Sequence, residues 1–315
     1  MKEYFERLTN SINSHEKIVL MTHSVPDLDG LGSAIAFCEI VKKLGKKCEI
    51  VAPKKLINKT LNKGIQYLKD EGFIIPFKYE KSIDGDMLVI FDASENYLIE
   101  CPDLLTMKDR FIIDHHSLGD DIISGDMFLD DSKSSTVEII CEYLKYLDLQ
   151  IDSRIYTVLY AGLYQDSNGF VLKTLPRTFE IASYLLTSGA NINLSYSILK
   201  ESMESITSRY DYIKKSEEIS DGIYLCVLDD RQCTRMTLAK VADEMIRFEE
   251  ASAAIAVGRH GNYTLVSARS CGNVDVFSFM KKLGGGGHFG AAAARCDESI
   301  ENIILKIKKI VMGEI

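Results

Sequence analysis

The stretch "KIVLMTHSVPDLDGLGSAIAFCEIVKKL", residues 17–44, decides the fold class of this chain. Its first part, "KIVLMTH" (17–23), is an apolar run of strand length that ends in a polar loop. In its last part, residues 32–44, apolar side chains recur at helical spacing and share one face. A buried strand that leads directly into a helix is typical of a parallel sheet covered by helices.

Two further apolar runs, "DMLVIFDAS" (86–94) and "RFIIDHH" (110–116), support this interpretation. Short apolar strands that alternate with helices predict an α/β fold, with a parallel sheet and helices on both of its faces. From residue 222 the strand and helix patterns restart, and they predict a smaller C-terminal α/β domain with a glycine-rich loop. We therefore expect an N-terminal domain at 1–193, a helical connector at 194–220 and a C-terminal domain at 221–315.

The composition is that of a globular protein, with 46% hydrophobic residues, 26% charged residues and a net charge of −9. The negative charge argues against a long basic track for duplex DNA, but it allows a local anion pocket. The eight cysteines form no CxxC pair and mostly lie in apolar surroundings, which predicts reduced thiols. Because neither a signal-peptide pattern nor an apolar run of about 18 residues is present, we expect a soluble, cytoplasmic protein without a membrane partner.

Aspartates and histidines gather where the predicted strands end. Ligands of an open parallel sheet bind beyond the carboxyl ends of its strands, so we expect these loops to converge on one point. Close carboxylates repel each other and are costly to desolvate unless a cation lies among them. The residues concerned are His23, Asp27 and Asp29 after the first run, Asp92 after the second, Asp114, His115 and His116 after the third, and Asp166 after a later helical pattern.

This combination of side chains predicts a metal centre. Mixed histidine and carboxylate ligation suits Mn²⁺, Mg²⁺, Fe²⁺ or Co²⁺. Five or six such ligands fit two ions about 3.5–4 Å apart, an arrangement that activates water for attack on phosphorus. Each residue also has an ordinary alternative, such as Asp27 or Asp29 capping the next helix, or Asp92 simply ending a strand.

The stretch "LGGGGHFGAAAAR" (283–295) predicts a second site, which would bind an anion. Glycines allow close approach of the backbone, and we expect the small residues after them to open a helix with free N–H groups. An arginine at the end of the predicted strand "VSARS" would clamp a phosphate, although a surface arginine and a flexible turn are the alternatives. The residues expected to bind substrate are Arg269, Gly284, Gly285, Gly286, Gly287 and His288.

Together these motifs resemble those of the DHH phosphoesterase superfamily. "MTHSVPDLDGLGSA", "LVIFDAS", "IIDHH" and "GLYQDSNGF" look like its four N-terminal motifs, and "VDVFSFMKKLGGGGHFGAA" resembles its associated C-terminal domain. The likeness is greatest to nanoRNases or pAp phosphatases, which cleave very short RNA and dephosphorylate adenosine 3′,5′-bisphosphate (pAp). Two departures are Ala293 at an expected glycine and "DSNG" in place of Asp-Thr-Gly, where Asn168 tolerates a left-handed backbone.

The resemblance implies two Mn²⁺ ions that share one bridging carboxylate. Asp114 would orient His115 from behind, and His116 would contact the scissile phosphate and help the leaving group. Arg269 and residues 284–288 would bind the far phosphate or the terminal nucleotide. The implied metal ligands are His23, Asp27 and Asp92 for the first ion, and Asp29, Asp92, His115 and Asp166 for the second.

The sequence favours one function over two others. The first is a Mn²⁺-dependent phosphoesterase that acts on very short single-stranded RNA or on pAp. The second is a phosphodiesterase that cleaves cyclic di-AMP or its linear product pApA. The third is a nucleotide-sensing module without catalysis, but the presence of every expected ligand argues against it. The sequence leaves open which substrate and metal are used in the cell and whether the protein forms a homodimer.

Overall fold

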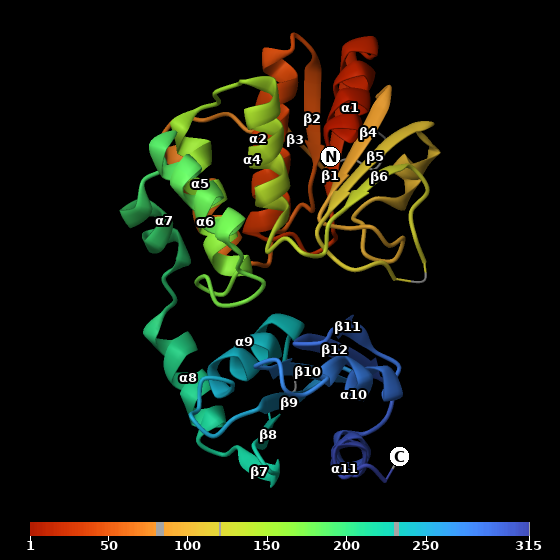
Figure 1. Ribbon diagram of the computed structural model, residues 1–315, viewed down its shortest axis with the longest axis vertical. Helices are drawn as coiled ribbons and strands as arrows, with labels where there is room; N and C mark the ends of the chain where they lie inside the picture. Colours follow the sequence, from red (N-terminus) through yellow and green to blue (C-terminus); the bar gives the residue numbers. More distant parts are fainter. Residues whose placement is uncertain (80–84, 120, 230–232, 315) are drawn as a thin grey trace. The chain divides into compact units, whose positions relative to one another are not determined.

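The structure, a computed structural model, describes residues 1–79, 85–119, 121–229 and 233–314 (Figure 1). The chain divides into two compact units, Met1–Lys200 and Glu201–Ile315. The division falls inside the stretch at 194–220 that was expected to connect two domains, between the helices α7 (Ile192–Leu199) and α8 (Met203–Ile213). Among the described residues, no helix is long and apolar enough to cross a membrane.

Unit 1 contains a sheet of six parallel strands in the order β3-β2-β1-β4-β5-β6 (Figure 1). In β1, Ile18 lies opposite Cys48 of β2 on one side and Met87 of β4 on the other. The strand order therefore reverses at β1, and the predicted parallel sheet is confirmed. The strands are β1 (Lys17–Thr22), β2 (Lys47–Val51), β3 (Phe77–Lys78), β4 (Met87–Phe91), β5 (Asp109–Asp114) and β6 (Asp126–Leu129).

The α-helices of unit 1 pack on one face of this sheet. Alternate residues of a strand point to opposite faces, so Ile18 and Leu20 join the helical core, whereas Val19 and Met21 face the other side. That second face is covered by loop residues and the 3₁₀-helix η1 (Pro102–Thr106), where α-helices were expected. The helices are α1 (Lys2–Ser14), α2 (Leu28–Lys43), α3 (Lys59–Asp70), α4 (Thr136–Leu147), α5 (Ser153–Asp166), α6 (Pro176–Thr187) and α7.

Unit 2 contains a mixed sheet in the order β11-β12-β10-β9-β8-β7, in which only β8 and β9 run parallel among the described pairs. One core lies between the sheet and α10 and α11, and a second lies between the sheet and α9. The elements are α8, β7 (Glu217–Ser220), β8 (Ile223–Leu228), α9 (Arg235–Met245), β9 (Ala253–His260), β10 (Tyr263–Ser270), α10 (Val276–Lys282), β11 (Gly286–His288), β12 (Ala291–Cys296) and α11 (Ile300–Val311).

Candidate metal centre

Three neighbouring strands of unit 1 end in the side chains that the sequence singles out. β1 leads into His23, β4 leads into Asp92, and β5 ends at Asp114. Because the strand order reverses between β1 and β4, these residues lie at the switch point where open parallel sheets bind ligands. Helix ends supply the others, namely Asp27 and Asp29 at the start of α2 and Asp166 at the end of α5.

His23, Asp27 and Asp92 form a first group able to hold a metal ion, with ligand atoms within 4.8 Å of one another. Nε2 of His23 lies 3.8 Å from Oδ1 of Asp27 and 3.4 Å from Oδ2 of Asp92. The same Asp27 oxygen accepts a 3.0 Å hydrogen bond from the N–H of Gly30. Asp27 therefore also caps α2, and its ordinary role as a helix cap does not remove it from the group.

Asp29, His115 and Asp166 form a second group of the same kind. Nε2 of His115 is buried, makes no hydrogen bond within the described structure, and lies 3.7 Å from Oδ2 of Asp29 and 3.2 Å from Oδ2 of Asp166. It also lies 3.3 Å from Oδ1 of Asp92, whose Oδ2 faces His23. Asp92 thus lies between the two groups, with one carboxylate oxygen directed toward each imidazole.

The backbone of Asp92 is left-handed, with a φ of 58°. This conformation costs a non-glycine residue roughly 1–2 kcal/mol, and such strain is concentrated at functional sites. The surroundings hold it in place, because the N–H of Asp92 donates to the carbonyl of Ile113 at 2.9 Å and its carboxylate accepts from the hydroxyl of Thr136 at 3.3 Å. Gly30 provides the room, since a Cβ there would lie 3.2 Å from the Cβ of Asp92.

The carboxylate of Asp29 is fully buried and is held by the first turn of α4. The N–H groups of Thr136 and Val137 each donate to one of its oxygens at 2.8 Å. The start of a helix carries a partial positive charge, so it stabilises the ionised carboxylate. Gly162 allows α5 to pack closely against α2, because a Cβ added at this position would lie 2.9 Å from a backbone oxygen of α2. This close packing brings Asp166, at the end of α5, to the same place.

The electrostatics of the cluster show a shortage of positive charge. Burial opposes protonation of His23 and His115, yet their contacts with carboxylates hold the pKa of both well above the usual value. Burial and neighbouring carboxylates raise the pKa of Asp29 and Asp166. At Asp92 burial is outweighed by the contacts with both histidines, so its pKa lies well below the usual value. The residues fit divalent cations, which would supply the missing charge to a set of nitrogen and oxygen ligands.

Asp114 contacts a different histidine from the expected one. Its Oδ1 accepts from the N–H of His116 at 3.1 Å and lies 2.8 Å from Nδ1 of the same residue. The expected contact with His115 is wrong, because the Asp114 carboxylate accepts from the backbone N–H two residues on, as in an Asx turn, and this brings it to the His116 ring. Nδ1 of His115 lies instead 3.4 Å from the carbonyl oxygen of Lys133, which leaves Nε2 for the cluster. The side chain of His116 is 49% exposed, and with Asp92 and His115 it forms a third group able to hold an ion.

The structure adds a buried polar network that the sequence reasoning missed. The side chain of Lys133 is only 2% exposed, and its Nζ lies 2.7 Å from Glu142 of α4. Glu138, also buried, accepts hydrogen bonds of 2.6 and 2.8 Å from Ser134 and Thr178. These contacts tie the loop before α4 to α6, and so support the helix start that holds the buried carboxylate. The available signal was the pair of acidic residues within the apolar helical pattern "STVEIICEYL".

The glycine-rich stretch of unit 2 forms a hairpin, so the predicted helix start after His288 is wrong. β11 and β12 pair in antiparallel register, and the residues of β12 alternate between buried and exposed. The small side chains therefore follow the two-residue period of a strand. A Cβ at Gly285 would overlap the carbonyl oxygen of Ala293, so this glycine serves close packing. Ala293, at the position of an expected glycine, is exposed opposite Gly286.

Arg269 has a carboxylate partner within unit 2. Its Nε donates to Oδ1 of Asp243 at 2.7 Å, and its side chain is only 16% exposed. A phosphate at this guanidinium would therefore compete with Asp243. The sheet register places Arg269 of β10 and His288 of β11 opposite the same residue of β12, Ala291. The structure thus aligns Arg269 and His288 across three strands, about 10 Å apart along the sheet.

Two domain matches identify the class of protein. Residues 17–163 match the DHH family, N-terminal domain, and residues 222–313 match the DHHA1 domain. The chain therefore contains a DHH family N-terminal domain followed by a DHHA1 domain. The resemblance inferred from the motifs is confirmed.

The similar curated proteins include cyclic-di-AMP phosphodiesterases and an oligoribonuclease and PAP phosphatase. Cyclic-di-AMP phosphodiesterase GdpP of Bacillus subtilis is 31% identical over 91% of this chain and 46% of its own length. The cyclic-di-AMP phosphodiesterase PdeA of Listeria monocytogenes is 27% identical over 92% of this chain and 46% of its own length. The bifunctional oligoribonuclease and PAP phosphatase NrnA of Mycoplasma genitalium is 26% identical over 90% of each chain. This chain thus spans about half the length of the two phosphodiesterases.

Solved structures share the fold. An exopolyphosphatase-related protein from Bacteroides fragilis matches with a TM-score of 0.81 and 16% identity, over 99% of this chain and 96% of that one. RecJ from Thermus thermophilus, solved in complex with Mn²⁺, matches with a TM-score of 0.60 and 12% identity, over 99% of this chain and 54% of that one. At these identities the similarity describes the fold alone.

Proposed function

We propose that this protein is a metal-dependent phosphoesterase that hydrolyses very short single-stranded oligoribonucleotides to mononucleotides and dephosphorylates pAp to AMP. Unit 1 is the catalytic domain in this proposal, and unit 2 is the domain that binds the substrate. The DHH family N-terminal domain supports the reaction class. The oligoribonuclease and PAP phosphatase NrnA, similar over 90% of each chain, supports the substrate class.

One observation carries the proposal, namely the position of Asp92. Its two oxygens lie 3.4 Å from Nε2 of His23 and 3.3 Å from Nε2 of His115, so a single carboxylate serves both ligand groups. Two divalent ions held in this way, Mn²⁺ or alternatively Mg²⁺, Co²⁺ or Fe²⁺, would supply activated water and charge stabilisation for attack on phosphorus. The proposed ligands are His23, Asp27 and Asp92 for one ion, and Asp29, Asp92, His115 and Asp166 for the other.

The chain's own residues orient these ligands. The amides of α4 fix the carboxylate of Asp29, and the Lys133 carbonyl leaves Nε2 of His115 free to bind. His116 touches the scissile phosphate from the more exposed side of the cluster, and Asp114 orients it through Nδ1. Its Nε2–H donates a proton to the leaving oxygen, so these two residues act as the acid and its positioning carboxylate.

The test is a product time course on 5′-labelled di- to pentaribonucleotides with Mn²⁺, with pAp, pApA, cyclic di-AMP and a 24-mer in parallel. Mononucleotides should form fastest from two to four nucleotides, and pAp should yield AMP. A duplex of the 24-mer should be inert. Equal rates on the 24-mer and the dinucleotide would contradict the proposed substrate class, and no turnover by metal-loaded protein would contradict the enzyme itself.

A second candidate is hydrolysis of cyclic di-AMP to pApA. The observation in its favour is the 31% identity with cyclic-di-AMP phosphodiesterase GdpP over 303 residues. The same cluster would perform the reaction, because both substrates present a phosphodiester to the ligand groups. The two candidates differ in the first product, since cleavage of cyclic di-AMP releases pApA before any AMP. Faster turnover of cyclic di-AMP than of linear dinucleotides would favour this second function.

A further inference from the structure

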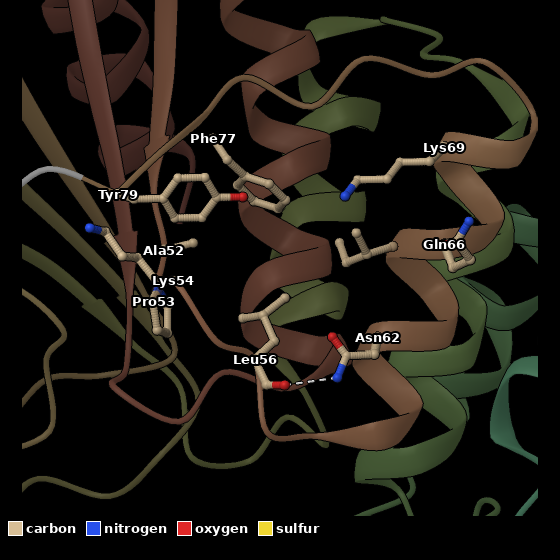
Figure 2. Close-up of a pocket in the computed structure, with 10 residues that line it drawn as sticks. Ala52, Pro53, Lys54, Leu56, Asn62, Gln66, Lys69, Phe77 and Tyr79 are labelled. Carbon is tan, nitrogen blue, oxygen red and sulfur yellow. Dashed lines mark hydrogen bonds between the residues drawn. The ribbon is translucent and has the colours of Figure 1, made fainter.

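Unit 1 has a pocket that the proposed metal centre does not use. It lies between α3 and the short edge strand β3, and it has a volume of about 350 Å³ (Figure 2). Small-molecule pockets in proteins begin at about 300 Å³, so it has room for one compact ligand. The lining residues come from the segment that follows β2, from α3, and from β3 with the residue after it. None of these residues belongs to the groups able to hold a metal.

The walls of the pocket combine aromatic and aliphatic surfaces. Phe77 and Tyr79 lie side by side with ring centroids 6.2 Å apart, and Tyr79 is 46% exposed (Figure 2). Leu56 and Ile65 complete the apolar surface. An exposed aromatic ring beside aliphatic side chains suits a flat ring, because stacking and burial of apolar area act together.

Two lysines supply positive charge. Lys54, from the loop after β2, and Lys69, from α3, both line the pocket and are exposed. Figure 2 shows the ammonium group of Lys69 directed toward the two aromatic rings, whereas that of Lys54 points away from Lys69, beyond Tyr79. Neither lysine forms an ion pair with any residue that the structure describes, whereas the nearby Lys78 pairs with Glu49 at 3.6 Å. In a chain with a net charge of −9, two such cations at one pocket favour an anionic ligand.

The side-chain amide of Asn62 determines which hydrogen-bonding atom the pocket presents to a ligand. Nδ2 of Asn62 donates to the carbonyl of Leu56 at 2.8 Å, as Figure 2 shows. This bond holds the amide with its Nδ2 toward Leu56 and its Oδ1 toward the pocket, where Oδ1 can accept a hydrogen bond from a ligand. An exocyclic amino group on an aromatic base satisfies that acceptor, whereas a carbonyl at the same position would repel it.

We propose that this pocket binds a nucleoside monophosphate that carries an amino base, with the base against Tyr79 and Phe77, the phosphate at Lys69, and Lys54 adding positive charge at the rim. Each element of such a ligand has a counterpart on the walls: a flat ring, an amino group and a dianion. The site is separate from the metal centre, so binding requires neither metal nor turnover. A negative result for the proposed hydrolysis would therefore not contradict this binding site, and a negative result for binding would not contradict the hydrolysis.

The test is calorimetric titration of AMP into the full chain in EDTA, where hydrolysis is absent. Wild type and Asp92→Ala should bind AMP equally, since the site does not involve the metal ligands. The double variant Lys54→Met, Lys69→Met should weaken binding by about ten-fold or more, because the cation that contacts the phosphate and the second positive charge at the rim are both lost. Lys78→Met is the matched control, because this neighbouring lysine has its own carboxylate partner, and it should bind AMP within two-fold of wild type.

Three other ligands separate the parts of the site. Adenosine and inorganic phosphate should each bind at least about ten-fold more weakly than AMP, since each makes only part of the contacts. IMP, which lacks the amino group, should bind more weakly than AMP, and Asn62→Leu should remove that difference. Phosphate binding as tight as AMP binding, or unchanged AMP binding in the double lysine variant, would overturn the proposal.

Discussion

The candidate metal centre of unit 1 and the glycine hairpin of unit 2 carry equally distinctive sequence motifs, but their polar atoms are used differently. At the metal centre, buried Nε2 of His115 makes no hydrogen bond within the described structure and faces three carboxylates. At the hairpin, Gly285 is needed by the packing, and the guanidinium of Arg269 is already paired with Asp243. A motif therefore points to a ligand most strongly where the fold leaves its polar atoms without another partner.

The two regions also differ in how their geometry is held. The metal centre combines a left-handed backbone at Asp92 with a carboxylate, that of Asp29, which is held by two amides. Such strain and burial persist only where the surroundings compensate for them. In the hairpin, Gly287 also has a positive φ of 137°, but glycine adopts such a backbone without a steric penalty.

The largest effect should come from Asp92→Ala. Removing the carboxylate shared by both ligand groups should lower kcat with Mn²⁺ by more than about 10³-fold, with little change in the circular dichroism spectrum. Asp103→Ala, an exposed aspartate of η1, is the control and should keep wild-type activity. Retention of more than a tenth of wild-type activity by Asp92→Ala would show that the two-ion arrangement is wrong.

His116→Ala should slow the chemical step by roughly 10²–10⁴-fold and leave the metal content near that of wild type. The reason is that His116 is half-exposed and held by Asp114, whereas the proposed ligands are buried deeper. Metal analysis together with single-turnover rates would measure both quantities. A loss of metal equal to that of Asp92→Ala would make His116 a ligand, as its grouping with Asp92 and His115 also allows.

In the hairpin, Gly285→Ala should destabilise unit 2 by about 1–3 kcal/mol, because the new Cβ would overlap the backbone of β12. Gly286→Ala is the matched control, since nothing lies within 4 Å of a Cβ at that position, and it should change stability by less than about 0.5 kcal/mol. Thermal unfolding would measure both. Equal stability of the two variants would mean that close strand packing does not explain the glycine run.

The smallest effect should come from Arg269→Ala. Its KM for a diribonucleotide should rise by about three- to ten-fold, while hydrolysis of p-nitrophenyl-TMP, which lacks a second phosphate, stays within two-fold of wild type. Asp243→Asn separates binding from structure, because it removes the negative charge that pairs with the guanidinium and keeps the guanidinium itself. If Arg269→Ala impairs hydrolysis of both substrates equally, Arg269 supports the fold of unit 2 and does not bind the second phosphate of the substrate.

Much of the fold and of the candidate site follows from local patterns. The strands that end at His23, Asp92 and Asp114 were predicted because continuous apolar runs and their polar ends lie within a few residues of one another. Their convergence follows from the geometry of parallel sheets, which places the carboxyl ends of the strands along one edge. The left-handed backbone of Asn168, with a φ of 47°, was likewise predicted from the residue type.

The tertiary structure decided what depends on partners distant in the sequence. The orientation of His116 by Asp114, the hairpin of the glycine run and the pairing of Arg269 with Asp243 were not predicted. The same holds for the pocket between β3 and α3, whose lysines carry no sequence motif. The sequence determines the chemistry of a side chain and its place in a local helical or strand pattern. The contacts of that side chain depend instead on register and packing across the whole chain.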